Sequence, residues 1–454
     1  MDGLGQVSLT RLWLLWTAGL ALCAVNLRDN VFLLPVALLV SVVVCLVSLC
    51  RDTAREVWWM FGAVLVVAFL GVAFVQFWIF ASPHLDQPWG PALAVAYAVL
   101  GVAGATLQRG GGWAFAAFLA VHVLLVAVLM RSMPVVSDVQ ALLDGGADAL
   151  LGGTSPYAIT VPGVYDSGHD WIYGPGVLVD GRITYGYPYL PIPLLVVVPA
   201  YLLGDVRIAV VLAMVVSAVL VRRLADDRLG RVAAVLLLVM PVSWATSLSY
   251  WIEPILLLFV VCLAHALQRG TNRAAFWFGC FLASKQYAVV HLPYLWMLAR
   301  ASGRRAVLVA LAVPAVLCSV FFLWDPRAFL HSAVEFHLKQ PLRYDTVTLT
   351  PALQDVLGDG ATFLLGPYGF VLGAAASALV AWRCRPGAAT FAAGIGLSLA
   401  VSVLFSKQGH PNYWDLIGGA LLVAVVTYRE SPRTPQPRWH TPAGDLAEPL
   451  RHRG

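Results

Sequence analysis

A polar interval begins at Arg131 with the sequence R-S-M-P-V-V-S-D-V-Q-A-L-L-D-G-G-A-D-A-L-L-G-G-T-S-P-Y. It ends at Arg207 with Y-G-Y-P-Y-L-P-I-P-L-L-V-V-V-P-A-Y-L-L-G-D-V-R, in which aromatic residues and prolines lie beside a short apolar run. Apolar segments long enough to cross about 30 Å of hydrocarbon precede and follow this interval. We therefore expect residues 131–207 to form a loop at a membrane face, held in place by the surrounding helices.

The composition of the whole chain supports this membrane setting. Hydrophobic residues make up 60% of the sequence and charged residues 12%, with a mean hydropathy of +0.80, whereas about a quarter of an average soluble domain is charged. The seven cysteines lie in or beside apolar runs without a C-x-x-C spacing, which argues against a disulfide framework. The sequence predicts an all-α polytopic integral membrane protein, which we place in the plasma membrane.

Arginine-bearing loops orient the chain, because positively charged residues concentrate on the cytoplasmic side of membrane proteins. Placing the arginine clusters of 222–231 and 300–305 inside puts 131–207 and 325–361 outside. Hydropathy and this bias together give fourteen crossings with both termini in the cytoplasm. The expected crossings are 12–27, 31–50, 57–80, 91–107, 112–130, 206–221, 232–247, 254–267, two half-length helices within 274–299, 306–324, 362–382, 388–406 and 413–428.

This topology divides the chain into parts. They are an N-terminal extension of four helices (1–111), a core with the first outer loop (112–324), the second outer loop (325–361), C-terminal helices (362–428) and a Pro- and Arg-rich cytoplasmic tail that we expect to be disordered (429–454). The apolar run 187–203 contains four prolines and would place 222–231 outside if it crossed the membrane. We therefore expect it to be interfacial or re-entrant.

The start of the first outer loop predicts a short helix. S-D-V-Q at 137–140 fits a capping box, in which Ser137 caps the helix and Gln140 reaches back to the cap. Apolar residues recur at helical spacing after it, so we expect this helix to lie along the membrane surface, its length limited by glycine pairs at 145–146 and 152–153. Asp138 follows the cap, where an acidic residue favours a helix start without any chemical role.

Basic residues of the outer segments are candidates for binding an anion. The three lysines of the chain, Lys285, Lys339 and Lys407, are each followed by Gln and lie outside the expected cytoplasmic loops. His337, Arg343 and His410 lie in the same outer segments. Such groups also bind lipid headgroups or simply face water. Lys285 is expected at the hinge of two half-length helices, where it reaches a substrate cavity, snorkels or pairs with Glu253.

Several short motifs together resemble one family, the GT-C class of membrane glycosyltransferases, and most closely the bacterial mannosyltransferases that use polyprenyl-phosphate mannose. The resemblance covers roughly residues 112–428. The motifs are S-D at 137–138, A-L-L-G-G-T-S-P-Y at 149–157, Y-P-Y-L-P at 187–191, A-S-K-Q at 283–286, Q-P-L-R-Y-D-T-V-T-L at 340–349 and K-Q-G-H-P-N-Y at 407–413. It does not account for the four helices of the N-terminal extension.

The resemblance implies an active site built from both outer loops. In this family an Asp shortly after the first core helix is the general base, and Asp138 matches it. A carboxylate accepts the proton of the attacking hydroxyl, and the lipid phosphate that leaves needs positive charge beside it. The implied phosphate-binding residues are Arg343, Lys339, Lys407, His337 and His410. The implied substrate-binding residues are Tyr157, Tyr187, Tyr189, Lys285, Gln286, Asp345 and Asn412.

The resemblance also implies the partners, which are a polyprenyl-phosphate sugar, a lipid-linked or glycan acceptor and membrane lipids, with no nucleic acid. We expect no organic cofactor. Asp144, Asp148, Asp166, His169, Asp170 and Asp415 could include ligands of a divalent metal, but no ligand spacing singles one out. Donors with arabinose, glucose or galactose remain open, as do a lipid or sugar transporter and a glycan polymerase. Tyr157, Tyr187 and Tyr189 could stack on sugars or anchor the chain at the membrane interface.

Overall fold

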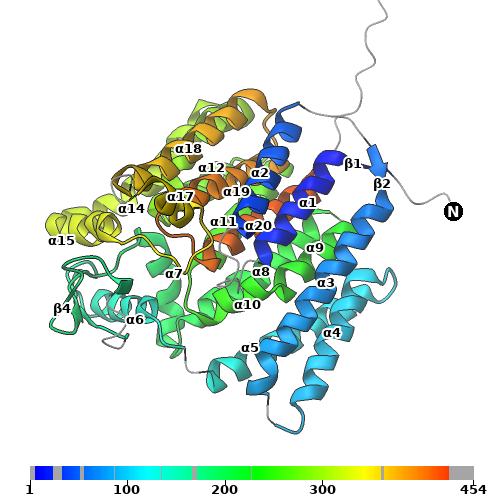
Figure 1. Ribbon diagram of the computed structural model, residues 1–454, viewed down its shortest axis with the longest axis horizontal. Helices are drawn as coiled ribbons and strands as arrows, with labels where there is room; N and C mark the ends of the chain where they lie inside the picture. Colours follow the sequence, from blue (N-terminus) through cyan, green and yellow to red (C-terminus); the bar gives the residue numbers. More distant parts are fainter. Residues whose placement is uncertain are drawn as a thin grey trace, which may run out of the picture.

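We describe the protein from a computed structural model, in residues 6–23, 33–51, 56–85, 87–133, 135–165, 171–225, 228–358 and 362–428. The tail expected to be disordered (429–454) lies outside the described residues, as do Asp166, His169 and Asp170. The described chain is mainly helical, with little sheet. Figure 1 shows the helical bundle with α6 and the small sheet at one side, near α15, and α3, α4 and α5 at the other.

Most helices coincide with the apolar runs of the sequence. The N-terminal half contains α1 (Leu9–Leu22), α2 (Leu33–Arg51), α3 (Trp59–Ala81), η1 (Ser82–His84), α4 (Gly90–Thr106), α5 (Gly111–Ser132), α6 (Asp138–Leu151), α7 (Pro191–Leu202) and α8 (Arg207–Leu224). The rest contains α9 (Arg228–Val239), α10 (Pro241–Leu248), α11 (Glu253–Gln268), α12 (Arg273–Leu282), η3 (Gln286–His291), α13 (Tyr294–Ser302), α14 (Arg304–Trp324), α15 (Pro326–Leu330), η4 (His331–Glu335), α16 (Phe336–Lys339), α17 (Thr350–Leu357), α18 (Thr362–Arg383), α19 (Ala388–Leu404) and α20 (Pro411–Thr427).

Two small sheets complete the described structure. Strands β1 (Gln6–Ser8) and β2 (Glu56–Trp58) pair antiparallel, with Val7 opposite Val57. Strands β3 (Val161–Pro162), β4 (Leu178–Val179) and β5 (Arg182–Ile183) form a second sheet in the order β3-β5-β4. Asp180 and Gly181, both with positive φ, turn the chain between β4 and β5, which is the turn that Asp-Gly favours. These strands are a minor correction to the all-α expectation.

The central helix of the bundle is α20. It packs against α1, α8, α9, α10, α11 and α19, and every residue from Trp414 to Thr427 is buried. A helix that is apolar all round is stable only when other helices surround it. Because α20 begins at Pro411, within the 407–413 motif, this deeply packed helix carries the end of that motif in its first turn.

Four described helices are long and apolar enough to cross a membrane, or up to six if each of two bent pairs counts as one span. Their outward side chains fit this role, since Val67, Trp113 and Leu323 are 70%, 84% and 75% exposed, and apolar surface of this kind belongs in lipid. Fewer spans are found than the fourteen expected because several expected crossings form shorter helices, such as α1 with 14 residues and α11 with 16. These features are those of a helical membrane protein.

The chain is interrupted at two segments that the sequence marked as irregular, while their placement relative to a membrane stays a prediction. Residues 274–299 form two short helices, α12 and α13, with Ser284, Lys285 and Gln286 in the break between them. The proline-rich run 187–203 does not continue straight into the next helix, because α7 and α8 meet at an angle of 111°.

The capping box is wrong. Ser137 occupies the cap position of α6, but its side chain caps no described backbone group; instead the Asp138 carboxylate accepts a hydrogen bond from the N–H of Val139, at 2.8 Å. The helix continues through Gly145 and Gly146 and ends at Leu151. Its apolar residues, among them Leu142 and Leu143, are buried against protein.

Candidate active site

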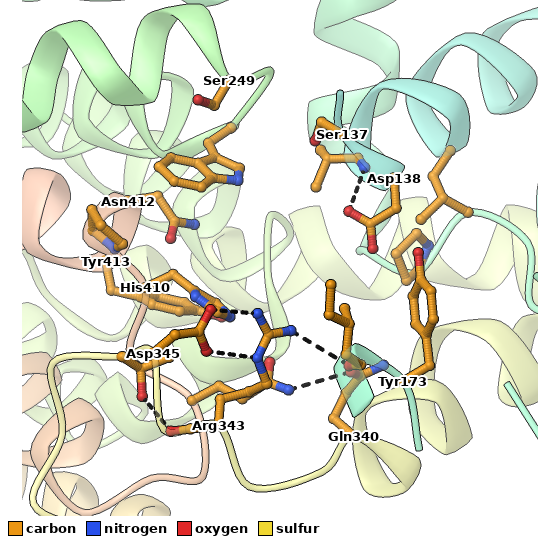
Figure 2. Close-up of a pocket in the computed structure, with 18 of the residues that line it drawn as sticks. Ser137, Asp138, Tyr173, Ser249, Gln340, Arg343, Asp345, His410, Asn412 and Tyr413 are labelled. Carbon is orange, nitrogen blue, oxygen red and sulfur yellow. Dashed lines mark hydrogen bonds and ion pairs between the residues drawn. The ribbon is translucent and has the colours of Figure 1, made fainter. Parts of the chain in front are cut away.

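A cavity of about 470 Å³ opens where the two expected outer loops meet. Its lining also includes two short connections, around Ser249 to Trp251 and around Gln408 to Tyr413. Figure 2 shows Ser137, Asp138 and Tyr173 on one side of this pocket and Asp345, His410 and Asn412 on the other. Segments that are distant in the sequence therefore contribute polar side chains to one space, large enough for a substrate group.

One wall of the cavity presents Asp138 from the first residue of α6. Its Oδ1 accepts hydrogen bonds from the Val139 N–H and, at 3.3 Å, from the Tyr165 hydroxyl. Burial raises the pKa of Asp138, while these hydrogen bonds and the more distant Arg343 lower it by less. Tyr173 also lines this wall, and burial beside Asp138 raises the pKa of both Tyr165 and Tyr173. The net effect of burial is a raised affinity of Asp138 for a proton, which suits a general base.

The opposite wall presents Arg343 from the second outer loop. Its guanidinium binds Asp345 through two hydrogen bonds, Nε to Oδ1 at 2.8 Å and NH2 to Oδ2 at 2.7 Å. It also donates to the Ile172 carbonyl and lies over the Trp171 ring, 4.7 Å from its centroid. Burial opposes the ionisation of Asp345, but the hydrogen bonds and positive charge of Arg343 outweigh burial and lower its pKa.

Backbone pairing places this second wall. The N–H groups of Arg343, Val347 and Leu349 donate to the carbonyls of Lys407, Gly409 and Leu404 at 3.0, 3.0 and 2.8 Å. Gly409 permits the close approach, because a Cβ at this position would lie 2.4 Å from a Thr348 methyl carbon. The second outer loop is thereby fixed to the segment that leads into α20, so Arg343 and His410 reach the cavity together.

The two outer loops are also joined directly. The buried Ser332 hydroxyl donates to the Tyr157 carbonyl at 2.7 Å and accepts from the Gly186 N–H at 2.9 Å. Gln286 donates to the carbonyls of Pro188 and Ala333, one in each loop. These bonds determine the relative positions of the two walls.

At the same contact between the loops, Gly174 lies against the backbone of Lys339. A Cβ at position 174 would lie 1.6 Å from the Lys339 carbonyl oxygen. No side chain can occupy that space, so the close approach of the loops depends on a glycine at this position.

Lys285 reaches the cavity from the break between α12 and α13. Its Nζ lies 2.6 Å from Glu253 Oε1, and the two side chains are only 5% and 0% exposed. The ammonium also lies over the ring of Tyr189, 4.4 Å from its centroid. The pairing with Glu253, which the sequence left open, is therefore present, and Lys285 lines the cavity as well.

The two histidines lie at the cavity, but they carry no charge near neutral pH. Burial lowers the pKa of His337 to about 4, and burial together with the positive charge of Arg343 lowers the pKa of His410 to about 4. The ring of His337 is within 2.8 Å of the Pro188 carbonyl. As neutral rings they offer hydrogen bonds and no charge, which leaves Arg343 and Lys285 as the Arg and Lys side chains of the lining.

Most of the expected site residues meet at the cavity. They are Asp138, Tyr189, Lys285, His337, Arg343, Asp345, His410 and Asn412. The others lie outside its lining. Lys339 is exposed, Lys407 contributes its carbonyl to the loop pairing, Gln286 joins the loops, and Tyr157 and Tyr187 are buried core residues, 1% and 0% exposed. Neighbouring groups cover Tyr157 and Tyr187, and the expected contacts of these five residues with substrate stay predictions.

Sequence reasoning missed several lining residues. Tyr165, Tyr173, Ser249, Trp251, Gln340, Tyr344, Gln408 and Tyr413 also line the cavity. The sequence contained a signal for two of them, because Gln340 and Gln408 directly follow the candidate lysines Lys339 and Lys407. The Gln408 amide donates to Gln340 Oε1 at 3.3 Å and to the Pro341 carbonyl at 3.2 Å. In these two Lys-Gln pairs the amide faces the cavity instead of the ammonium.

A metal centre is not evident among the described residues, because they contain no group of three or more His, Cys, Asp or Glu side chains placed to hold an ion. Comparisons with protein-family models, with curated proteins and with solved structures found no match to this chain.

Proposed function

We propose that the protein transfers a sugar, with mannose as the first candidate, from a polyprenyl-phosphate donor to a lipid-linked or glycan acceptor at the outer membrane face. The observation that carries this proposal is that a carboxylate and a guanidinium lie on opposite walls of one cavity. Asp138 has no cationic partner among the described residues and a raised pKa, whereas Arg343 presents a guanidinium across the cavity.

The chemistry assigns each wall a role. The acceptor hydroxyl loses its proton as it attacks the anomeric carbon, and Asp138 accepts that proton. The bond from the anomeric carbon to the donor phosphate breaks, and the lipid phosphate leaves as an anion. Arg343 supplies positive charge and N–H donors for the phosphate oxygens, which stabilises the departing charge. His410, Gln340 and Gln408 offer hydrogen bonds for sugar hydroxyls.

The proposal includes a fold and a topology. We propose a GT-C-like arrangement with fourteen crossings, both termini in the cytoplasm and the cavity on the outer side of the plasma membrane. This is supported by the origin of the lining, because the two outer loops and the connections 249–251 and 408–413 were all placed outside from the sequence, and all four contribute to the same cavity.

The test is an assay of transfer with the purified full-length protein. Polyprenyl-phosphate mannose with a labelled sugar is incubated with a crude lipid-glycan extract as acceptor, without any nucleotide. The expected result is a labelled product. Efficient transfer from GDP-mannose by protein free of polyprenyl phosphate would overturn the proposal, as would the absence of transfer from every polyprenyl-phosphate sugar tested.

A transporter is the second candidate, favoured by the buried Lys285–Glu253 pair and the buried Asp415, since ionisable groups within membrane helices often mark a transport path. Reconstituted vesicles separate the two functions. Movement of a labelled lipid or sugar across the membrane without a new glycosidic bond would favour transport.

A further inference from the structure

Three acidic or amide side chains lie at the cavity lining and directly behind it, in α20 and at the start of α11. Asn412 lines the cavity and Asp415 follows it on the same face of α20. α20 packs against α10 and α11, and the Ser243 hydroxyl of α10 donates to Asp415 Oδ1 at 2.8 Å. Glu253, the first residue of α11, is close enough to Asp415 to act on it electrostatically.

Each of these three side chains has an acceptor oxygen without a hydrogen-bond partner among the described residues. The atoms are Asn412 Oδ1, Asp415 Oδ2 and Glu253 Oε2. The side chains are deeply buried, with Asn412 4% exposed and the two acids 0% exposed. Buried polar atoms almost always have partners, so three unpartnered acceptors in one region indicate a bound group that all of them contact.

The charges in this cluster do not balance. Lys285 neutralises Glu253, but among the described residues no Lys, Arg or His pairs with Asp415. An isolated buried carboxylate is costly unless a positive charge compensates it. One positive charge is therefore needed to compensate the Asp415 carboxylate.

The number of acceptors separates a cation from a proton. A proton on Asp415 supplies one donor and leaves two of the three oxygens unmatched. A hard cation contacts several oxygens at once and prefers carboxylate, amide and hydroxyl oxygens. The Thr246 hydroxyl also lies beside Asp415, and its hydrogen bond at 2.7 Å is donated to the Val242 carbonyl.

We infer that Asn412, Asp415 and Glu253 bind one monovalent metal cation behind the cavity. The single unmatched charge and the few protein oxygens fit a monovalent ion better than a divalent one. Asn412 lines the cavity, so the ion reaches the site from that side. This inference does not depend on sugar transfer, and it assigns a function to Asp415 and to the free oxygen of Glu253.

The test measures thermal unfolding of the purified full-length protein in detergent. Choline chloride is replaced stepwise by NaCl at constant chloride, with KCl and LiCl as parallel series. At least one metal ion is expected to raise Tm by a few degrees along a saturating curve, because a ligand that binds only the folded state stabilises it.

Variants make the assignment specific. Asp415→Asn should abolish the saturating rise in Tm, and Asn412→Leu should increase the half-saturating concentration at least about tenfold, the effect of removing one oxygen ligand. Asp355→Asn, which changes an exposed carboxylate of α17, should leave the rise unchanged. If Asp415→Asn does not fold, Asn412→Leu still decides the result.

Equal Tm in choline, Na⁺, K⁺ and Li⁺ would overturn the inference. So would an ion effect that persists unchanged in both site variants. An infrared carboxylic-acid band that disappears in Asp415→Asn, together with no ion dependence, would assign a proton to the site instead. None of these readouts uses a sugar donor, so they remain distinct from a failure of the transfer assay.

Discussion

Two carboxylates face the same cavity from opposite walls, and their surroundings differ. Asp138, in the first outer loop, accepts hydrogen bonds from a backbone N–H and a tyrosine, and burial raises its pKa. Asp345, in the second outer loop, is held by two hydrogen bonds from Arg343, and its pKa is lowered. Environments that push two pKa values apart assign different roles to similar groups.

This difference indicates which of the two carboxylates can exchange a proton. Asp345 stays ionised because its charge is compensated, so it positions Arg343 and does not act as a base. Asp138 binds a proton more readily because burial disfavours its charged form, and the hydrogen bonds that it accepts offset burial only in part. The sequence placed both residues at the site without distinguishing their protonation, which depends on partners that are distant along the chain.

The largest expected effect comes from removing the proton acceptor. Asp138→Asn keeps the shape of the side chain but cannot accept the proton, so transfer should fall at least about a hundredfold, or about 2.7 kcal/mol in activation free energy. The rate of labelled-product formation by purified protein measures this. Asp148→Asn, an exposed change on the same helix, should retain most activity. Near-normal transfer by Asp138→Asn would leave Asp138 with only a role at the start of α6.

A smaller effect is expected when the positive charge of Arg343 is removed from the second wall. Arg343→Gln removes the positive charge that lowers the pKa of Asp345 and the N–H fork that we assign to the donor phosphate. The KM for the lipid donor should rise roughly tenfold, the size of losing a hydrogen bond to a charged group, while the KM for the acceptor changes less. Lys339→Gln is the matched control, because Lys339 is exposed and lies outside the cavity lining. Equal losses in the two variants would argue against a phosphate role for Arg343.

The smallest expected effect is a change in the pH dependence of kcat/KM. The Tyr165 hydroxyl donates to Asp138 and favours its ionised form, so Tyr165→Phe should raise the pKa of Asp138 further. A base works when ionised, and activity is lost as pH falls through its pKa. The acidic limb of kcat/KM should therefore move to higher pH, by on the order of one unit or less, with activity preserved at alkaline pH. Tyr344→Phe, on the opposite wall, should leave the limb in place, and an unmoved limb in Tyr165→Phe would separate the limb from Asp138.

Hydropathy predicted the helices well because their signal is local. The start of α5 at Gly111, the end of α14 at Trp324 and the break around Lys285 lie within a few residues of the expected positions. The strands β4 and β5 were missed although Asp180–Gly181 between apolar residues is a hairpin signal. Such a short signal is easily overlooked beside long apolar segments.

Local sequence was enough to predict a helical membrane protein, the positions of its helices and several residues of the cavity. The length and spacing of apolar segments depend only on neighbouring positions. The tertiary structure alone decided which candidates share the cavity. Lys339 and Lys407 lie outside the lining while Gln340 and Gln408 face the cavity, since the loop pairing and the contact at Gly174 determine which side of each segment turns inward. The charge of His410 and the pairing of Lys285 with Glu253 were likewise decided by burial and by partners far along the chain, which no local pattern specifies.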